Sequence, residues 1–225
     1  MSIVLAIDSA QERCAVAVRA AGRTVAQRVL TGGKGHAEAV LPLVAETLAA
    51  AGVGYGDLQL LAATTGPGVF TGVRVGLAAV LGLRIALGIP AVGIGTLVAT
   101  AATARAEGAA GRILVVNDAR RDEVYLQGFA VDGTPEDDVA LLPLAEALGR
   151  AGAPAVLVGT AAHAIMALLP AAAALCVHDG SALPDAGIVA ALAEAAARSA
   201  QPPAPRPLYV RAPHITQPRV PGKDA

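Results

Sequence analysis

The spacing of apolar residues predicts that the first half of the chain alternates between strands and helices. Short apolar runs bounded by turn residues are typical of strands, and the turn Ala21-Gly22 joins two of them. From His36 onward the apolar positions recur every three to four residues, which predicts an amphipathic helix. We expect strands at residues 3–7, 15–18, 23–30, 58–64 and 90–94, and helices at 36–51 and 73–87.

The second half repeats the alternation and predicts a second lobe beginning near Gly111. A hairpin is expected over 112–129, followed by strand and helix patterns up to a last helix at 188–199. The fold class is therefore α/β with two lobes. We expect the lobes at residues 1–108 and 109–213, with the last helix packing back on the first lobe. Residues 214–225 form a Pro-rich, charged tail that we expect to be disordered.

Composition and charge exclude several classes of function. The chain has 225 residues, 55% of them hydrophobic, and 17 Lys and Arg balance 18 Asp and Glu. This excludes a disordered chain and a bulk basic surface for nucleic acid. Glycine and proline interrupt the uncharged stretches 85–104 and 151–178, and no basic leader precedes the first apolar run, so we expect no membrane segment and a cytoplasmic location. Both cysteines are expected to be buried thiols.

Two loops carry the candidates for nucleotide chemistry. Asp8 ends the first strand, where a carboxylate can hold a metal or a water, but the residues after it include no glycine to cradle a phosphate. We therefore prefer a turn-making Asp8 bonded to its own backbone. Gly66-Pro67-Gly68 stands between a strand and a helix, where an anion could bind. A tight turn that packs the helix explains the same glycines equally well, and the Lys of a P-loop is missing.

The remaining polar motifs favour structural roles. His36 and Glu38 open the first helix, but a second ligand on the same face would stand at position 40, which is Val40. We interpret His36 as a capping or surface residue. The charged run 118–123 is expected to be a solvated turn with local ion pairs, and a recognition loop is the alternative. We find no Ser/His/Asp or His-rich metal constellation in the sequence.

The second helix carries a row of small residues. Gly72, Gly76, Ala79 and Gly82 lower helix propensity but allow another backbone to approach closely. We interpret the row as a surface for tight packing against another helix.

Together these motifs resemble the TsaB (YeaZ) family along nearly the whole chain. The resemblance is carried by VLAIDSAQERCAVAV, GHAEAVLPLV, TTGPGVFTGVRVGLAAVLGLRIALGIPAVGIGTL, NDARRDEVYLQGF and PLYVR. It implies the fold of the actin, sugar kinase and heat-shock-protein ATPase superfamily, with mixed sheets flanked by helices. It also implies a non-catalytic paralogue of TsaD (Gcp), which supports threonylcarbamoylation of the adenosine next to the anticodon of tRNA.

The resemblance further implies partners and an interface. TsaD is the expected heterodimer partner, the ATPase TsaE joins a larger complex, tRNA is reached through that complex, and homodimerisation of the isolated chain is left open. The family's first two long helices form the contact, and a bulky charge at Gly76 or Ala79 is expected to break it without unfolding the lobe. The implied interface residues are His36, Val40, Val44, Gly72, Val75, Gly76, Ala79 and Leu83.

Two enzymatic alternatives remain. The glycine loop would suit an ATP-dependent kinase or phosphohydrolase of the same fold, and an M22-type metallopeptidase would need the metal ligand that Val40 replaces. We assign no catalytic residue, no cofactor and no metal site. Asp8, Gly66 and Gly68 are retained as candidates for a residual nucleotide site.

Overall fold

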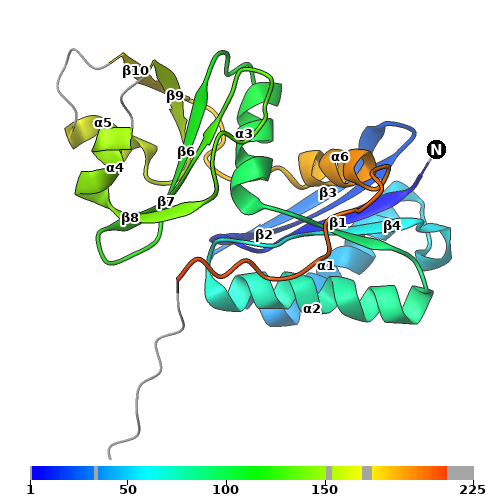
Figure 1. Cartoon of the computed structure of the whole chain (residues 1–225). Helices are drawn as coiled ribbons and strands as arrows, with labels where there is room; N and C mark the ends of the chain where they lie inside the picture. The colour runs from blue at the N-terminus through cyan, green and yellow to red at the C-terminus, as the bar shows by residue number, and fades with distance from the viewer. Residues whose placement is uncertain (1, 33–34, 151–153, 169–173, 212–225) are drawn as a thin grey trace, which may run out of the picture.

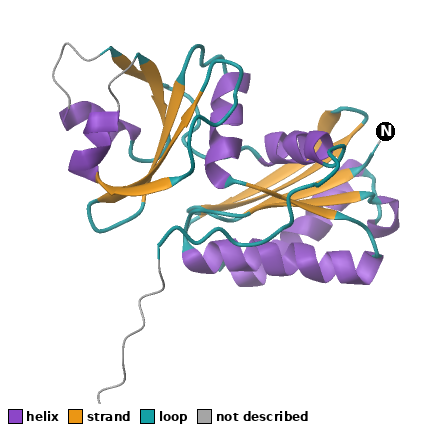
Figure 2. Cartoon of the chain, viewed as in Figure 1, coloured by secondary structure: helices purple, strands orange, loops and turns teal. Residues whose placement is uncertain are grey.

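The computed structural model describes residues 2–32, 35–150, 154–168 and 174–211. These residues form two lobes, each built on a five-stranded mixed sheet with helices on its faces (Figures 1 and 2). The α/β fold class with two mixed sheets is confirmed. The expected tail at 214–225 lies outside the described residues. The division at residues 108 and 109 stays a prediction about domains, although it falls in the loop between the last helix of the first half and the next strand.

The first sheet has the strand order β3-β2-β1-β4-β5. β1, β2 and β3 are antiparallel neighbours, whereas β4 and β5 continue the sheet parallel to β1. Helices α1 and α2 cover one face and α6 covers the other (Figure 1). The elements are β1 (Val4–Asp8), β2 (Arg13–Ala20), β3 (Arg23–Thr31), α1 (His36–Ala51), the short 3-10 helix η1 (Tyr55–Asp57), β4 (Leu60–Thr64), α2 (Phe70–Leu87), β5 (Ala91–Ile94) and α6 (Ala186–Ala196).

The second sheet repeats this plan with the order β8-β7-β6-β9-β10. β6, β7 and β8 are antiparallel neighbours, and β9 and β10 run parallel to β6. Helices α4 and α5 pack on one face, while α3 packs on the other. The elements are α3 (Thr96–Ala106), β6 (Ile113–Asp118), β7 (Glu123–Phe129), β8 (Ala140–Pro143), α4 (Leu144–Arg150), β9 (Ala155–Val158), α5 (Ala162–Leu168) and β10 (Leu175–Val177).

Apolar periodicity explains why these segments fold as they do. In α1 the buried residues Val40, Val44 and Leu48 recur at every fourth position and face the sheet. Strand β1 is buried along its whole length, because helices cover both faces of the sheet. A strand covered on both faces reads as a continuous apolar run, and this is the pattern of the first residues of the chain.

Three elements of the structure are missing from the sequence prediction. α3 was not expected, because most of its residues are buried and its apolar positions therefore show no clear helical period. The adjacent pair β8 and α4 was also missed, since both elements are short and β8 is only partly buried. Cys176 is exposed, so the expectation of two buried thiols is wrong for it and right for Cys14.

The segment 201–211, which we call the C-terminal strap, runs back over the first lobe after α6. The Gly93 amide donates to the Pro203 carbonyl at 2.9 Å, and the Leu208 amide donates to the Thr65 carbonyl at 2.8 Å. At the end of the strap Arg211 forms an ion pair with Glu123 of β7. The strap therefore contacts both lobes.

Helix α2 has the length and composition of a membrane-crossing helix. Its inner residues Val73, Leu77 and Val80 belong to the core beneath the first sheet, next to α1. Its inner side packs on the first sheet, and its outer side is exposed.

Candidate functional site

Three loops meet where the two lobes face each other. They are the β1–β2 loop (9–12), the glycine loop between β4 and α2 (65–69) and the β6–β7 turn (119–122). The Val69 amide donates to the Ala10 carbonyl at 2.7 Å, which joins the first two loops. Arg120 of the turn forms an ion pair with Glu12 at 2.6 Å, which joins the two lobes. The chain therefore has an interlobe cleft whose rim is fixed by polar contacts.

Asp8 lies beneath the cleft and has no solvent exposure. Its Oδ1 accepts hydrogen bonds from the Ala10 amide at 3.2 Å and the Thr64 hydroxyl at 2.7 Å, while Oδ2 has no partner among the described residues. Burial raises the pKa of Asp8 above its ordinary value. The bond to its own loop is the turn-making contact expected from the sequence.

The glycine loop packs tightly against the β1–β2 loop. A Cβ atom at Gly68 would overlap the Ala10 carbonyl oxygen, and Gly66 has a φ of +98° that side chains rarely adopt. Both glycines are therefore required by packing and backbone shape. Gly68 also lines the cleft, so a role in binding stays a prediction for this residue.

Two members of the row of small residues on α2, Gly72 and Gly76, face a loop of the same lobe and not another helix, so the sequence interpretation is wrong for these two. Packing of another helix on Ala79 and Gly82 stays a prediction. A Cβ atom at Gly72 would overlap the carbonyl oxygen of Ser9, and one at Gly76 would meet the Ser9 hydroxyl. The Ser9 hydroxyl donates to the Gly72 carbonyl at 2.8 Å. The two glycines let α2 approach the β1–β2 loop of the same lobe, so a charge at Gly76 is expected to damage the fold itself.

Besides Gly72 and Gly76, which are buried, the implied interface residues divide into two groups. His36, Val40 and Val44 are buried on the inner side of α1, whereas Val75, Ala79 and Leu83 are partly exposed on α2. His36 is 8% exposed and the N-cap of α1 is Gly35, so the expectation of a capping or surface histidine is wrong. Among the described residues no three His, Cys, Asp or Glu side chains gather as a metal site would require.

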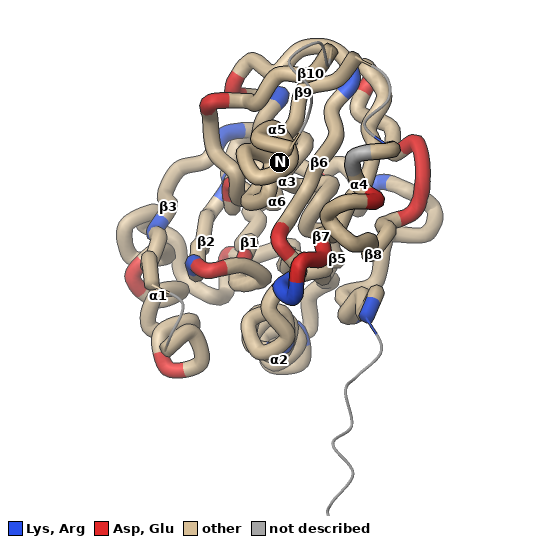
Figure 3. Tube along the Cα trace, turned by 90° about the vertical axis from the view of Figure 1, so that its left-hand side faces the viewer, with Lys and Arg blue, Asp and Glu red and all other residues tan. Residues whose placement is uncertain are grey.

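The charged β6–β7 turn contacts the first lobe, which the sequence did not indicate. Arg120, Arg121 and Asp122 have successive positive φ angles of 64°, 60° and 58°, a backbone conformation that is uncommon outside glycine. Arg120 also contacts Asp118 of the same turn. Figure 3 shows charges of both signs where β6 and β7 approach the first lobe. The turn is thus a contact between lobes as well as a solvated loop.

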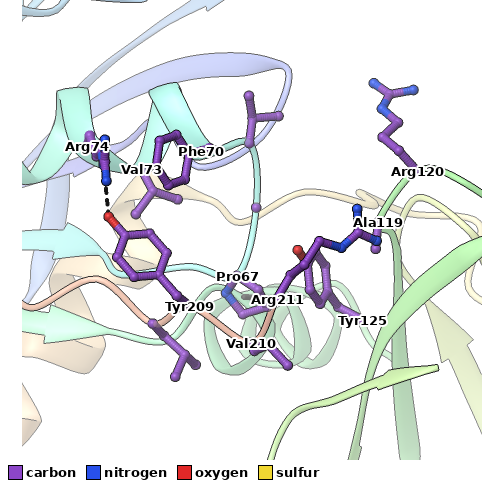
Figure 4. A pocket seen from close by; sticks show the side chains of 13 residues that line it. Pro67, Phe70, Val73, Arg74, Ala119, Arg120, Tyr125, Tyr209, Val210 and Arg211 are labelled. Atoms are coloured by element: carbon purple, nitrogen blue, oxygen red, sulfur yellow. Dashed lines mark hydrogen bonds between the residues drawn. The ribbon is translucent and has the colours of Figure 1, made fainter. Parts of the chain in front are cut away.

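Two adjoining cavities occupy the cleft. The larger, of about 570 Å³, lies between α2, the β6–β7 turn and the strap (Figure 4). The smaller, of about 230 Å³, is more polar and includes Gln11, Glu12 and Thr160. Sequence reasoning missed Gln11, Tyr125 and Tyr209 as cleft residues. The only signal for Tyr209 was the motif PLYVR, whose position against the first lobe no local pattern reveals.

Comparison with known proteins finds relatives whose names refer to threonylcarbamoyladenosine in tRNA. The family model described as tRNA N6-adenosine threonylcarbamoyltransferase matches residues 30–151. The tRNA threonylcarbamoyladenosine biosynthesis protein TsaB of Escherichia coli is 37% identical over 129 residues, which are 57% of this chain and 55% of that protein. The matched region thus spans about half the length of this relative. An uncharacterised protein of Mycobacterium tuberculosis is 36% identical over 95% of this chain and 93% of its own length.

Solved structures extend the likeness to the whole fold. YeaZ from Pseudomonas aeruginosa superposes with a TM-score of 0.79 at 30% identity, covering 93% of this chain and all of that chain. An inorganic polyphosphate/ATP-glucomannokinase from Arthrobacter, at 16% identity and a TM-score of 0.52, shares the fold alone. The paired sheets with a cleft between them define a protein with the actin-like ATPase fold. Within that class the chain belongs to the TsaB (YeaZ) family.

Proposed function

We propose that this chain is a non-catalytic subunit of the tRNA threonylcarbamoyl transferase complex, and that it binds TsaD through the outer face of α1 and α2. The proposal rests on membership of the family and on one observation, which is that the outer face of α1 and α2 is apolar and exposed to solvent. It includes a cytoplasmic location, a larger complex with the ATPase TsaE, and contact with tRNA through that complex.

The outer face of α2 is apolar and uncovered. Ala78, Gly82 and Ile85 are exposed along it, and Ile85 is 84% exposed. The helix contains no acidic residue, and Arg74 and Arg84 are its only charges. Ile85 is the large apolar side chain of this face, and the small residues beside it leave an apolar surface of the kind that binds another protein.

Helix α1 extends this surface. Leu41 is 52% exposed, and Pro42 and Ala45 lie next to it on the outer side. The two helices contact each other and pack on the same face of the sheet (Figure 1), and we take their outer sides together as the candidate contact surface. Of the interface residues implied by the family, Val75, Ala79 and Leu83 are the ones that can contribute directly.

The non-catalytic role is supported by the chemistry of the residues present. The position that would complete a histidine pair on α1 is Val40, which is buried in the core. Asp8 has no exposure and is held by Thr64 and its own loop, and it lines neither cavity of the cleft. These residues are suited to holding the lobe together.

The test is binding of the full chain to purified TsaD, with a charge placed on the outer face. Ala78→Glu is expected to weaken binding by about 2 kcal/mol, or roughly 30-fold in Kd, because a desolvated carboxylate lies in the contact. Ala195→Glu is the matched control, since Ala195 is exposed on α6, on the opposite face of the same sheet. Equal binding by both variants would rule out the proposed surface.

The enzymatic alternatives predict different results. A kinase or phosphohydrolase should bind Mg-ATP and turn it over in the absence of TsaD. A metallopeptidase should retain stoichiometric metal after purification. Either result, combined with full transferase activity in the absence of this chain, would replace the subunit proposal.

A further inference from the structure

The larger cavity of the cleft has the composition of a ligand site. Its volume of about 570 Å³ lies within the usual range for small-molecule pockets. Its walls come from the glycine loop, the start of α2, β7 and the C-terminal strap, so both lobes and the chain end contribute (Figure 4). Aromatic and aliphatic side chains, including Phe70, Tyr209 and Leu208, form most of the lining.

One wall carries a positive charge with no opposite charge beside it. The guanidinium carbon of Arg74 lies 3.7 Å from the centre of the Phe70 ring, and its Nε donates to the Tyr209 hydroxyl at 2.9 Å. No carboxylate within the described residues forms an ion pair with Arg74, whereas Arg120 pairs with Glu12 and Arg211 with Glu123. The ring and the hydroxyl fix the direction of the guanidinium and leave its two terminal nitrogens available.

The opposite wall carries the hydroxyl of Tyr125. Tyr125 is 9% exposed as a whole residue and lines the cavity. Figure 4 shows this hydroxyl directed into the cavity. Burial raises the pKa of Tyr125, so the group is a protonated donor at neutral pH. A hydroxyl that points into the cavity can donate a hydrogen bond to an oxygen of a ligand.

We propose that this cavity binds a small carboxylate with an aromatic or branched aliphatic body. The body lies among Phe70, Tyr209 and Leu208, the carboxylate binds Arg74, and Tyr125 donates to a second oxygen of the ligand. The site goes beyond the proposed scaffold function, because it lies in the cleft and does not use the outer face of the helices.

The charges of the cleft favour a carboxylate over a polyphosphate. The polar cavity next to the site is lined by the carboxylates of Glu12 and Asp118, and Arg120 is already paired with both. A ligand with several negative charges would meet these carboxylates, whereas a single charge near Arg74 would not.

The experiment is a calorimetric and NMR titration of the full chain with phenylpropionate, and with phenylpropanol and propionate as partial ligands. Phenylpropionate is expected to bind at one saturable site. Phenylpropanol lacks the charge and propionate lacks the ring, so each is expected to bind at least ~10-fold more weakly. Equal binding of the acid and the alcohol would overturn the assignment of Arg74.

Two pairs of variants locate the site. Arg74→Gln is expected to weaken phenylpropionate binding ~10-fold, and Tyr125→Phe about 3-fold. Arg84→Gln, on the last turn of the same helix, and Tyr55→Phe, exposed on the first lobe, are the matched controls and should leave binding unchanged. Thermal unfolding of each variant checks that it is folded.

Three results would overturn the proposal. The first is the absence of saturable phenylpropionate binding by the folded wild-type chain. The second is equal binding by Arg74→Gln and Arg84→Gln. The third is displacement of phenylpropionate by Mg-ATP from a site that Arg74→Gln leaves intact, which would assign the cleft to nucleotide instead.

Discussion

The inner and outer faces of α2 both carry small residues, but these residues are closely packed on the inner face and exposed on the outer face. On the inner face Gly72 and Gly76 let the helix lie against Ser9 of the same lobe. On the outer face Ala78 and Gly82 contact no other part of the chain closely enough to be buried. A row of small residues therefore identifies close approach only where a neighbour is present, and elsewhere it leaves a smooth apolar surface.

The largest effect that tests this comparison is expected at Gly72. In Gly72→Ala the added methyl group would overlap the Ser9 carbonyl oxygen, so α2 or the β1–β2 loop must shift. We expect a loss of about 3 kcal/mol in the free energy of unfolding, measured by urea denaturation. A loss below about 0.5 kcal/mol would mean that the inner face is looser than described.

An effect of intermediate size is expected for Asp8, which precedes the β1–β2 loop that contacts the inner face of α2. It is a dependence of the free energy of unfolding on pH. The folded state raises the pKa of Asp8, so between the ordinary value of 3.8 and the raised value the folded chain holds a proton that the unfolded chain has lost. The stabilisation from that proton is complete below pH 3.8 and disappears as pH rises through the folded pKa.

Asp8→Asn lacks this titration. The stability of the variant relative to wild type should therefore increase as pH rises, by about 1.4 kcal/mol for each unit by which the pKa is raised, and then level off. Urea unfolding at a series of pH values measures the difference, with the exposed Glu46→Gln on α1 as a matched control. A relative stability that falls with rising pH would contradict a raised pKa of Asp8 in the folded chain.

The smallest effect belongs to the outer face. Gly82 has no atom within contact distance of an added Cβ and has no positive φ. Gly82→Ala is expected to raise the free energy of unfolding by about 0.5–1 kcal/mol through helix propensity alone. A decrease in the free energy of unfolding for Gly72→Ala and an increase for Gly82→Ala would establish the contrast between the two faces. A decrease for Gly82→Ala would mean that another part of the chain packs against the outer face.

The sequence predicted the elements whose apolar pattern is strong. The five strands of the first sheet and helices α1 and α2 lie within a few residues of their expected positions, because each has one clear period and turn residues at its ends. Helix α3 has buried residues on most of its sides, so its pattern resembles no amphipathic template. A helix that is buried on several sides, such as α3, therefore cannot be recognised from an amphipathic pattern.

The cleft could be predicted only in part. Asp8 and the glycine loop were identified because a polar residue or a glycine after an apolar run is a local signal. Tyr125, Arg74 and Tyr209 are brought together by the packing of elements up to 135 residues apart, as in the Arg74–Tyr209 hydrogen bond. The same holds for Ser9, whose contact with α2 reverses the meaning of the glycines there.

Residues 186–211 return to the first lobe, so this lobe can complete its folding only after they have been synthesised. Val4, Ala6 and Ala62 lie on a sheet face that is covered by α6 together with Ala99 of α3, and the amide of Gly93 donates to the carbonyl of Pro203. During translation α6 can cover this apolar face only after residues 186–196 have been synthesised. A premature stop after β10 would release a chain without α6, whose residues Val189, Ala190 and Ala193 pack on this face of the first sheet.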